Sequence, residues 1–161
     1  MPALLRTTYH FFLKSDFMDT SKSLWGQLPL EGNVRTPLII LREQATLLTQ
    51  MTNAVLEGTV TSQKFAPSSD PFDFSPPNKT FRTTLAIEAP ALDGYVFQVL
   101  QVNYDLALYP VEVVDLINKK NTECANETDF NDAVGSILSS EAVRRAVGML
   151  LAQSKSEQLA A

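Results

Sequence analysis

The 161-residue sequence is poor in the residues on which enzymes and metal sites depend, with one cysteine, one histidine and six scattered glycines. Cys124 alone can form neither an intrachain disulfide nor a cysteine-rich zinc site, and a reducing cytoplasm is the simplest compartment for it. His10 alone cannot supply a two-histidine metal site. The dispersed glycines assemble no phosphate-binding loop. We therefore expect no metal site and no cofactor.

The sequence also offers few residues suited to nucleophilic catalysis. A Ser-His-Asp or Cys-His arrangement would have to use His10, which lies in an apolar run typical of a structural histidine. Cys124 lies in a polar segment near Lys119 and Lys120, and such cations can lower a thiol pKa when they are close in space. A bystander cysteine is the favoured interpretation. The sequence leans towards a protein that is not an enzyme.

Acidic residues are only in modest excess over basic ones, since the formal net charge is -5 and the pI is about 4.8. Proteins that bind nucleic acids or anionic membranes carry a basic stripe, so we expect neither activity. No apolar run approaches the roughly 20 residues that cross a bilayer. Phe11-Phe12-Leu13 is too short for the core of a secretion signal. These features predict a cytoplasmic protein.

What the chain does contain is enough apolar material for a core. With 45% hydrophobic and 19% charged residues, it is typical of one globular domain, here expected over residues 1–161. Prolines and turn-forming residues gather at 18–35 and 66–79, which we expect to be irregular. The small, polar residues 155–161 predict a frayed tail.

The stretch from Phe81 to Leu116 predicts an antiparallel sheet. Apolar and β-branched residues alternate with polar ones from Phe81 and again from Tyr95 to Val102, and a third run follows at 111–114. Asp93-Gly94 supplies the positive φ that a tight reversal between the first two runs needs. We expect further strands at 7–13, where a short helix is the alternative, and at 59–65, and a polar connection at 118–126.

Three helices complete the prediction. Thr36 is a good N-cap with Pro37 behind it, and the apolar spacing that follows favours a helix that Gly58 closes as a left-handed C′ residue. Two C-terminal helices are expected around Phe130 and Val143, separated by Ser139-Ser140-Glu141. The elements predict an α+β fold, in which an antiparallel β-meander of about four to five strands packs against three helices as a two-layer sandwich.

The run from Val96 to Val102 is apolar on both faces. Such a run predicts a central strand covered on both sides, with a second subunit as the second cover, so we expect a homodimer.

One polar cluster is a candidate small-molecule site. Polar side chains gather between two predicted strands, where Pro110 interrupts the ladder. They are Asn103 together with the four proposed ligand-binding residues Tyr104, Asp105, Tyr109 and Glu112. Chemistry there would be carboxylate general-base catalysis assisted by a tyrosine. The alternative interpretation is a solvated turn with packed tyrosines, and the sequence favours it.

A second candidate surface is the proline-rich segment, in which Phe72 and Phe74 could bind a partner or pin the segment to the domain. Two functional hypotheses follow. The first is a non-catalytic interaction or regulatory protein that binds another protein. The second is a small-molecule-binding protein or enzyme that uses the tyrosine and carboxylate cluster.

Overall fold

The computed structural model describes residues 35–64 and 81–160. Contacts divide the chain into two units, Met1–Asn33 and Val34–Ala161, and every described residue belongs to the second. The predicted strand at 7–13 lies outside the described residues, as do His10, Phe72 and Phe74. A single domain over the whole chain therefore stays a prediction.

The second unit is built on a five-stranded antiparallel sheet with the strand order β1-β2-β3-β4-β5. Its strands are β1 (Glu57–Lys64), β2 (Phe81–Ala89), β3 (Tyr95–Tyr104), β4 (Val111–Asp115) and β5 (Lys120–Cys124). The helices are α1 (Pro37–Met51), α2 (Glu127–Leu138) and α3 (Glu141–Ala160), with a 3-10 turn η1 at Pro90–Leu92. The predicted α+β sandwich of a meander and three helices is confirmed.

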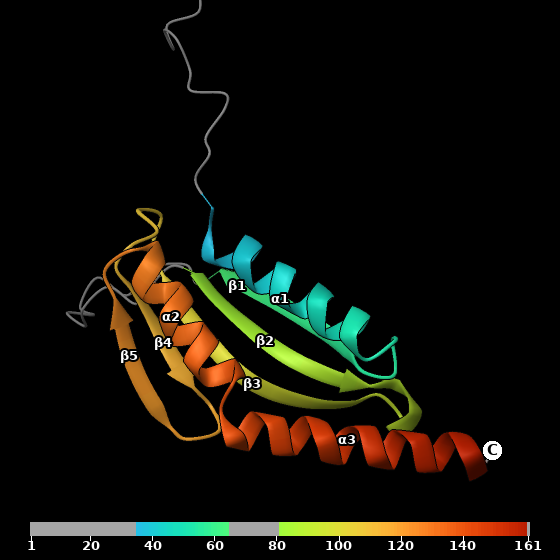
Figure 1. Cartoon of the computed structure of the whole chain (residues 1–161). Helices are drawn as coiled ribbons and strands as arrows, with labels where there is room; N and C mark the ends of the chain where they lie inside the picture. Colours follow the sequence, from blue (N-terminus) through green and yellow to red (C-terminus); the bar gives the residue numbers. More distant parts are fainter. Residues whose placement is uncertain (1–34, 65–80, 161) are drawn as a thin grey trace, which may run out of the picture. The chain divides into compact units, whose positions relative to one another are not determined.

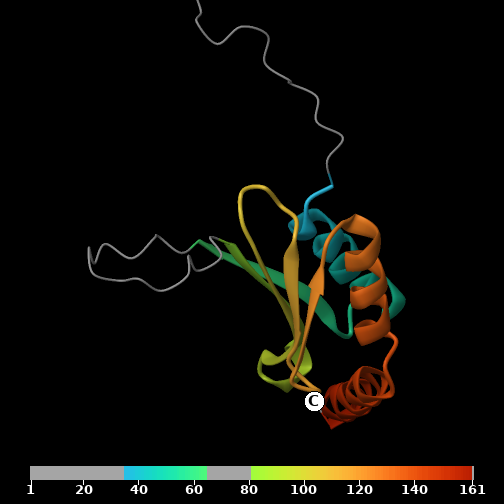
Figure 2. The same cartoon turned by 90° about the vertical axis from the view of Figure 1, so that its left-hand side faces the viewer.

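All three helices lie on one side of the sheet (Figures 1 and 2). Helix α1 follows β1 and β2, α2 lies along β4 and β5, and α3 passes the end of the sheet near η1 (Figure 1). Because side chains alternate between the faces of a strand, every second residue points at this helical layer. The core between the layers includes the fully buried residues Leu41, Leu56, Val102, Val113 and Phe130.

A β-bulge explains why β3 looks apolar on both faces. Leu85 pairs with Leu100 and Ala86 pairs with Gln98, so Val99 is the extra residue. Val99 and Leu100 are consecutive, yet both are fully buried. The predicted central position of this strand is confirmed, but the bulge accounts for the pattern without a second cover: Val96 is half exposed on the other face. The homodimer stays a prediction.

The expected end of α1 was wrong. The helix ends at Met51, and Asn53 rather than Gly58 is the left-handed C′ residue, with φ 50°. The Ala54 amide donates to the Thr49 carbonyl at 2.8 Å and the Asn53 amide to the Gln50 carbonyl at 3.1 Å, which is the Schellman pattern. Asparagine tolerates this conformation because its short polar side chain permits positive φ.

Gly58 instead belongs to β1, where it lets α1 approach closely. A Cβ atom on Gly58 would lie 2.3 Å from the Ala45 carbonyl oxygen. The Gly58 amide donates to the Thr49 hydroxyl at 2.9 Å, which ties strand and helix together. Glycine is required here for close packing and not for a turn.

The connection predicted at 118–126 was also wrong, since it contains the edge strand β5. Four of its five residues are exposed and only Cys124 is buried, so no apolar alternation marks it. The turn before it is fixed by Asp115, whose carboxylate accepts from the Ile117 amide at 2.9 Å and the Asn118 amide at 3.0 Å. Burial raises the pKa of Asp115, but these hydrogen bonds and nearby Lys120 outweigh it and lower the pKa.

The C-terminal helices follow the predicted break. The Asn126 side chain accepts from the Asp129 amide at 2.9 Å and caps α2, and the Ser140 hydroxyl accepts from the Val143 amide at 3.3 Å at the start of α3. Helix α3 runs on to Ala160, through most of the predicted frayed tail, although residues 155–160 are all exposed.

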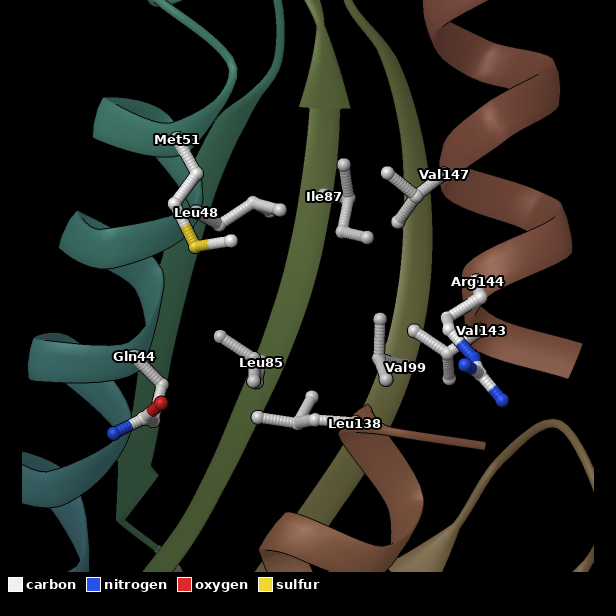
Figure 3. A pocket seen from close by; sticks show the side chains of 10 residues that line it. All are labelled: Gln44, Leu48, Met51, Leu85, Ile87, Val99, Leu138, Val143, Arg144 and Val147. Carbon is white, nitrogen blue, oxygen red and sulfur yellow. The ribbon is translucent and has the colours of Figure 1, made fainter. Parts of the chain in front are cut away.

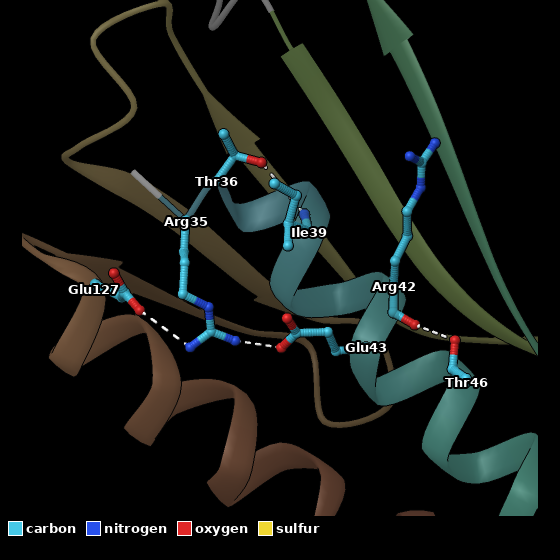
Figure 4. Close-up of polar contacts among 7 residues, drawn as sticks. All are labelled: Arg35, Thr36, Ile39, Arg42, Glu43, Thr46 and Glu127. Atoms are coloured by element: carbon cyan, nitrogen blue, oxygen red, sulfur yellow. Dashed lines mark hydrogen bonds and ion pairs between the residues drawn. The ribbon is translucent and has the colours of Figure 1, made fainter. Parts of the chain in front are cut away.

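Arg35 joins the starts of α1 and α2. Its guanidinium pairs with Glu43 on α1 and, at 3.5 Å, with Glu127 on α2, while the Thr36 hydroxyl accepts from the Ile39 amide (Figure 4). The pairs are half exposed, so each contributes about 1 kcal/mol or less. They connect the two helices at this end of the layer but contribute little to its stability. None of the described helices is both long and apolar enough to span a bilayer.

Candidate binding groove

The helical layer leaves an apolar groove over the middle of the sheet. Its floor is formed by Leu85 and Ile87 of β2 and Val99 of β3, with α1 on one side and α3 on the other (Figure 3). The bulge at Val99 turns that side chain towards the helices. The enclosed volume is about 320 Å³.

The two walls come from residues at helical spacing. Gln44, Leu48 and Met51 stand at i, i+4 and i+7 on α1, so they share one face of the helix. The opposite wall is built at the break between α2 and α3, and it comprises Leu138, Val143, Arg144 and Val147. The break turns the chain so that the last turn of α2 closes one end of the groove (Figure 3).

The groove continues onto exposed apolar surface. Met51 is 82% exposed, and Leu47, on the same side of α1, is 46% exposed. Eight of the ten lining residues are apolar, and the other two are Gln44 and Arg144, on opposite walls (Figure 3). An apolar hollow with a few polar groups at its rim is the usual form of a binding site.

The lining has no chemistry of its own. Among the described residues that form it there is no carboxylate, cysteine, histidine or hydroxyl group. General acid-base or nucleophilic catalysis needs such a group within hydrogen-bond reach of the substrate. What this arrangement can do is bury apolar surface of another molecule.

A second hollow, of about 410 Å³, lies on the other flank of α3. Leu92, Tyr95 and Phe97 face Met149 and Gln153 across it, and Tyr95 and Met149 are more than half exposed. It is shallower than the groove and has no charged group in its lining.

The four residues of the predicted small-molecule site are not gathered in one cavity. Tyr104 points into the helical layer, where it stacks on Phe81 with ring centroids 5.4 Å apart and its hydroxyl lies 3.4 Å from that of Thr83. Glu112 pairs with Asn103, the neighbour of Tyr104 in β3, and so lies on the opposite face of the sheet. There its carboxylate accepts from the amides of Asn103 at 2.9 Å and Asn121 at 3.2 Å.

Asp105 and Tyr109 lie in the connection between β3 and β4. Asp105 is exposed, while the Tyr109 hydroxyl is buried and has no hydrogen-bond partner in the described part of the chain. Burial raises the pKa of Tyr109, and the carboxylate of Glu127 raises it further, with Arg35 opposing both. Ligand binding by these four residues stays a prediction, but the structure gives them no shared site.

Cys124 is fully buried, and burial together with the carboxylates of Asp129 and Glu123 raises the pKa of its thiol. Burial and a raised pKa both disfavour the reactive thiolate, and the bystander interpretation stays a prediction. Over residues 35–64 and 81–160, no group of histidine, cysteine and carboxylate side chains could hold a metal ion.

Sequence reasoning placed the groove's side chains on apolar faces but not around a hollow. Leu48, Leu85, Val143 and Val147 belong to apolar patterns that predict only a buried face. Met51, at i+3 from Leu48, extends the same apolar side of α1, and it was not singled out from the sequence.

Comparison of the chain with protein-family models, with curated proteins and with solved structures gives no match, so the groove is interpreted from its own residues alone.

Proposed function

We propose that this protein is a non-catalytic binding module whose groove accepts an amphipathic helix of a partner protein. The observation that carries the proposal is the uncovered apolar strip over β2 and β3 between two helices of the same layer. A helix laid there would continue the layer with the packing that α1 and α3 already use.

The dimensions of the groove support a helical occupant. Gln44 and Met51 are seven positions apart on α1, about 10 Å of helix at 1.5 Å per residue. An amphipathic helix with apolar anchors at i, i+3 or i+4, and i+7 covers the same length. Burying each such anchor contributes about 1.5–3 kcal/mol before the cost of association is subtracted.

A display library of short helical peptides tests the proposal. The expected result is enrichment of peptides whose apolar residues recur at i, i+3 or i+4, and i+7. Met51→Glu should weaken their binding about tenfold or more, because a charge enters the apolar contact at a position too exposed to affect folding.

Leu159→Glu is the matched control, since Leu159 is 89% exposed on α3 and does not line the groove. It should bind the selected peptides as the wild type does. Enriched peptides without helical spacing, or equal losses in both variants, would contradict the proposal. A small apolar molecule is the competing occupant, because about 320 Å³ is at the lower end of small-ligand pockets.

A further inference from the structure

We infer that the partner helix is acidic, with a carboxylate that pairs with Arg144 at the rim of the groove. The inference rests on the proposed function and adds the charge that the groove selects. Its starting point is that Arg144 is the one charged residue among the ten described residues that line the groove.

The guanidinium of Arg144 is not paired with a carboxylate within the described part of the chain. It is exposed and makes no ion pair or side-chain hydrogen bond there. Its neighbour Arg145 differs, since its guanidinium pairs with Glu141 at 2.6 Å, one helical turn away. Successive residues are 100° apart around a helix, so only Arg144 shares the side of α3 that carries Val147.

The surroundings of Arg144 favour an anion. No acidic side chain lines the groove, although the chain as a whole carries a net charge of -5. Arg144 stands in the first turn of α3, where the helix dipole adds positive potential, and the carboxylate in the same turn, Glu141, is paired with Arg145. Gln44, the other polar residue of the lining, lies on the opposite wall and carries no charge (Figure 3).

One cation beside an apolar hollow defines the class of partner. A nucleic acid or an anionic membrane is held by several cations that neutralise many phosphates, whereas here a single charge borders apolar surface. An amphipathic helix with one carboxylate at the edge of its apolar face matches that arrangement. A guanidinium also binds a carboxylate through two parallel hydrogen bonds, which adds a preferred orientation.

Six fluorescein-labelled helical peptides with the same leucine anchors test the inference by fluorescence anisotropy. They carry glutamate, glutamine or lysine beside the apolar face, and each of these residues is placed once in the first turn and once in the last turn of the helix. On the wild type at low salt, the glutamate peptide should bind about two- to fivefold tighter than the glutamine peptide, and the lysine peptide weaker than both. This preference should shrink at 0.5 M salt.

Arg144→Gln should abolish the preference, Arg145→Gln should retain it, and Arg144→Glu should reverse it in favour of the lysine peptide. Equal binding of the glutamate and glutamine peptides to the wild type would overturn the inference and leave the proposed function standing. A preference that survives in Arg144→Gln would also overturn it. If no peptide binds but decanoate displaces a bound apolar dye, both the helical partner and the proposed function are wrong.

Discussion

Replacing Gly58 with alanine tests how closely α1 is seated on the sheet. The added Cβ would lie 2.3 Å from the Ala45 carbonyl oxygen and 2.4 Å from the Ala45 Cα atom, whereas ordinary contacts begin at 3.4 Å. Both atoms belong to the helix backbone, so no side chain can rotate away. Helix α1 would have to retreat by about 1 Å, to the contact distance of packed atoms.

Moving α1 away from the sheet would lower the free energy of unfolding, and the size of this loss can be estimated. Overpacking a core typically destabilises a protein by about 1–3 kcal/mol, and a clash with backbone belongs at the upper end of that range. A small domain is stable by about 5–15 kcal/mol, so Gly58→Ala should remain folded but unfold at clearly lower urea concentration. Circular dichroism at 222 nm during a urea titration measures the shift.

Gly148→Ala is the control for glycine replacement itself. A Cβ on Gly148 meets nothing within 4 Å, and the residue lies within α3. Alanine is a better helix former, so this variant should gain about 0.5–1 kcal/mol. If Gly58→Ala unfolds at the same urea concentration as the wild type, α1 does not rest on β1 at Ala45, and the wall of the groove has been misplaced.

Two further stability predictions follow from the described turns and caps. Asp115→Asn should cost about 1–3 kcal/mol at pH 7, because a buried ionised acceptor is lost. The folded pKa of Asp115 lies below its ordinary value, so the stability advantage of the wild type over Asp115→Asn is complete above about pH 4 and is lost as pH falls through the folded pKa. Urea titrations at pH 7 and pH 3 would measure this loss. An equal advantage at both pH values would contradict the prediction. Asn126→Ala should cost about 1 kcal/mol in the same assay at pH 7, and Asn126→Ser, which keeps an acceptor without adding a charge beside Asp129, should cost less.

The sequence predicted turns and helix N-termini correctly where the local backbone conformation favours one residue type. Asp93 and Gly94 have φ values of 53° and 71° in the predicted reversal, and Pro37 begins α1 behind the Thr36 cap. Asn126 and not Thr128 caps α2, although the residue types allow either. Each of these positions depends on neighbours in the chain, so composition and spacing were enough to find it.

Features that depend on packing between elements could not be predicted from neighbouring residues in the sequence. Gly58 has the residue type of a helix C-cap, and only its contact with Ala45 shows that close approach is its role. Strand β5 is a polar edge strand, so the period of apolar residues that marks a strand is absent from it. The bulge at Val99 depends on the register between two strands.

The groove could not be predicted from the sequence for a related reason. A hollow is a gap between elements, and no residue pattern encodes the distance between α1 and α3. The small-molecule prediction failed to assemble geometrically because Tyr104 and Glu112, eight residues apart in sequence, occupy opposite faces of one sheet. Phe72 and Phe74 lie outside the described residues, and partner binding by them stays a prediction.

The most direct test of the account is to locate a selected peptide on the protein by methyl NMR. Titrating the peptide into protein labelled at isoleucine, leucine and valine methyl groups should shift the signals of Ile87, Val99 and Val147, which line the groove. Val96, which is half exposed on the other face of the sheet, should not shift. Shifts confined to Leu92 and Leu150 in the hollow on the other flank of α3, or to the face that carries Val96, would contradict the central claim that the groove over β2 and β3 is the binding site.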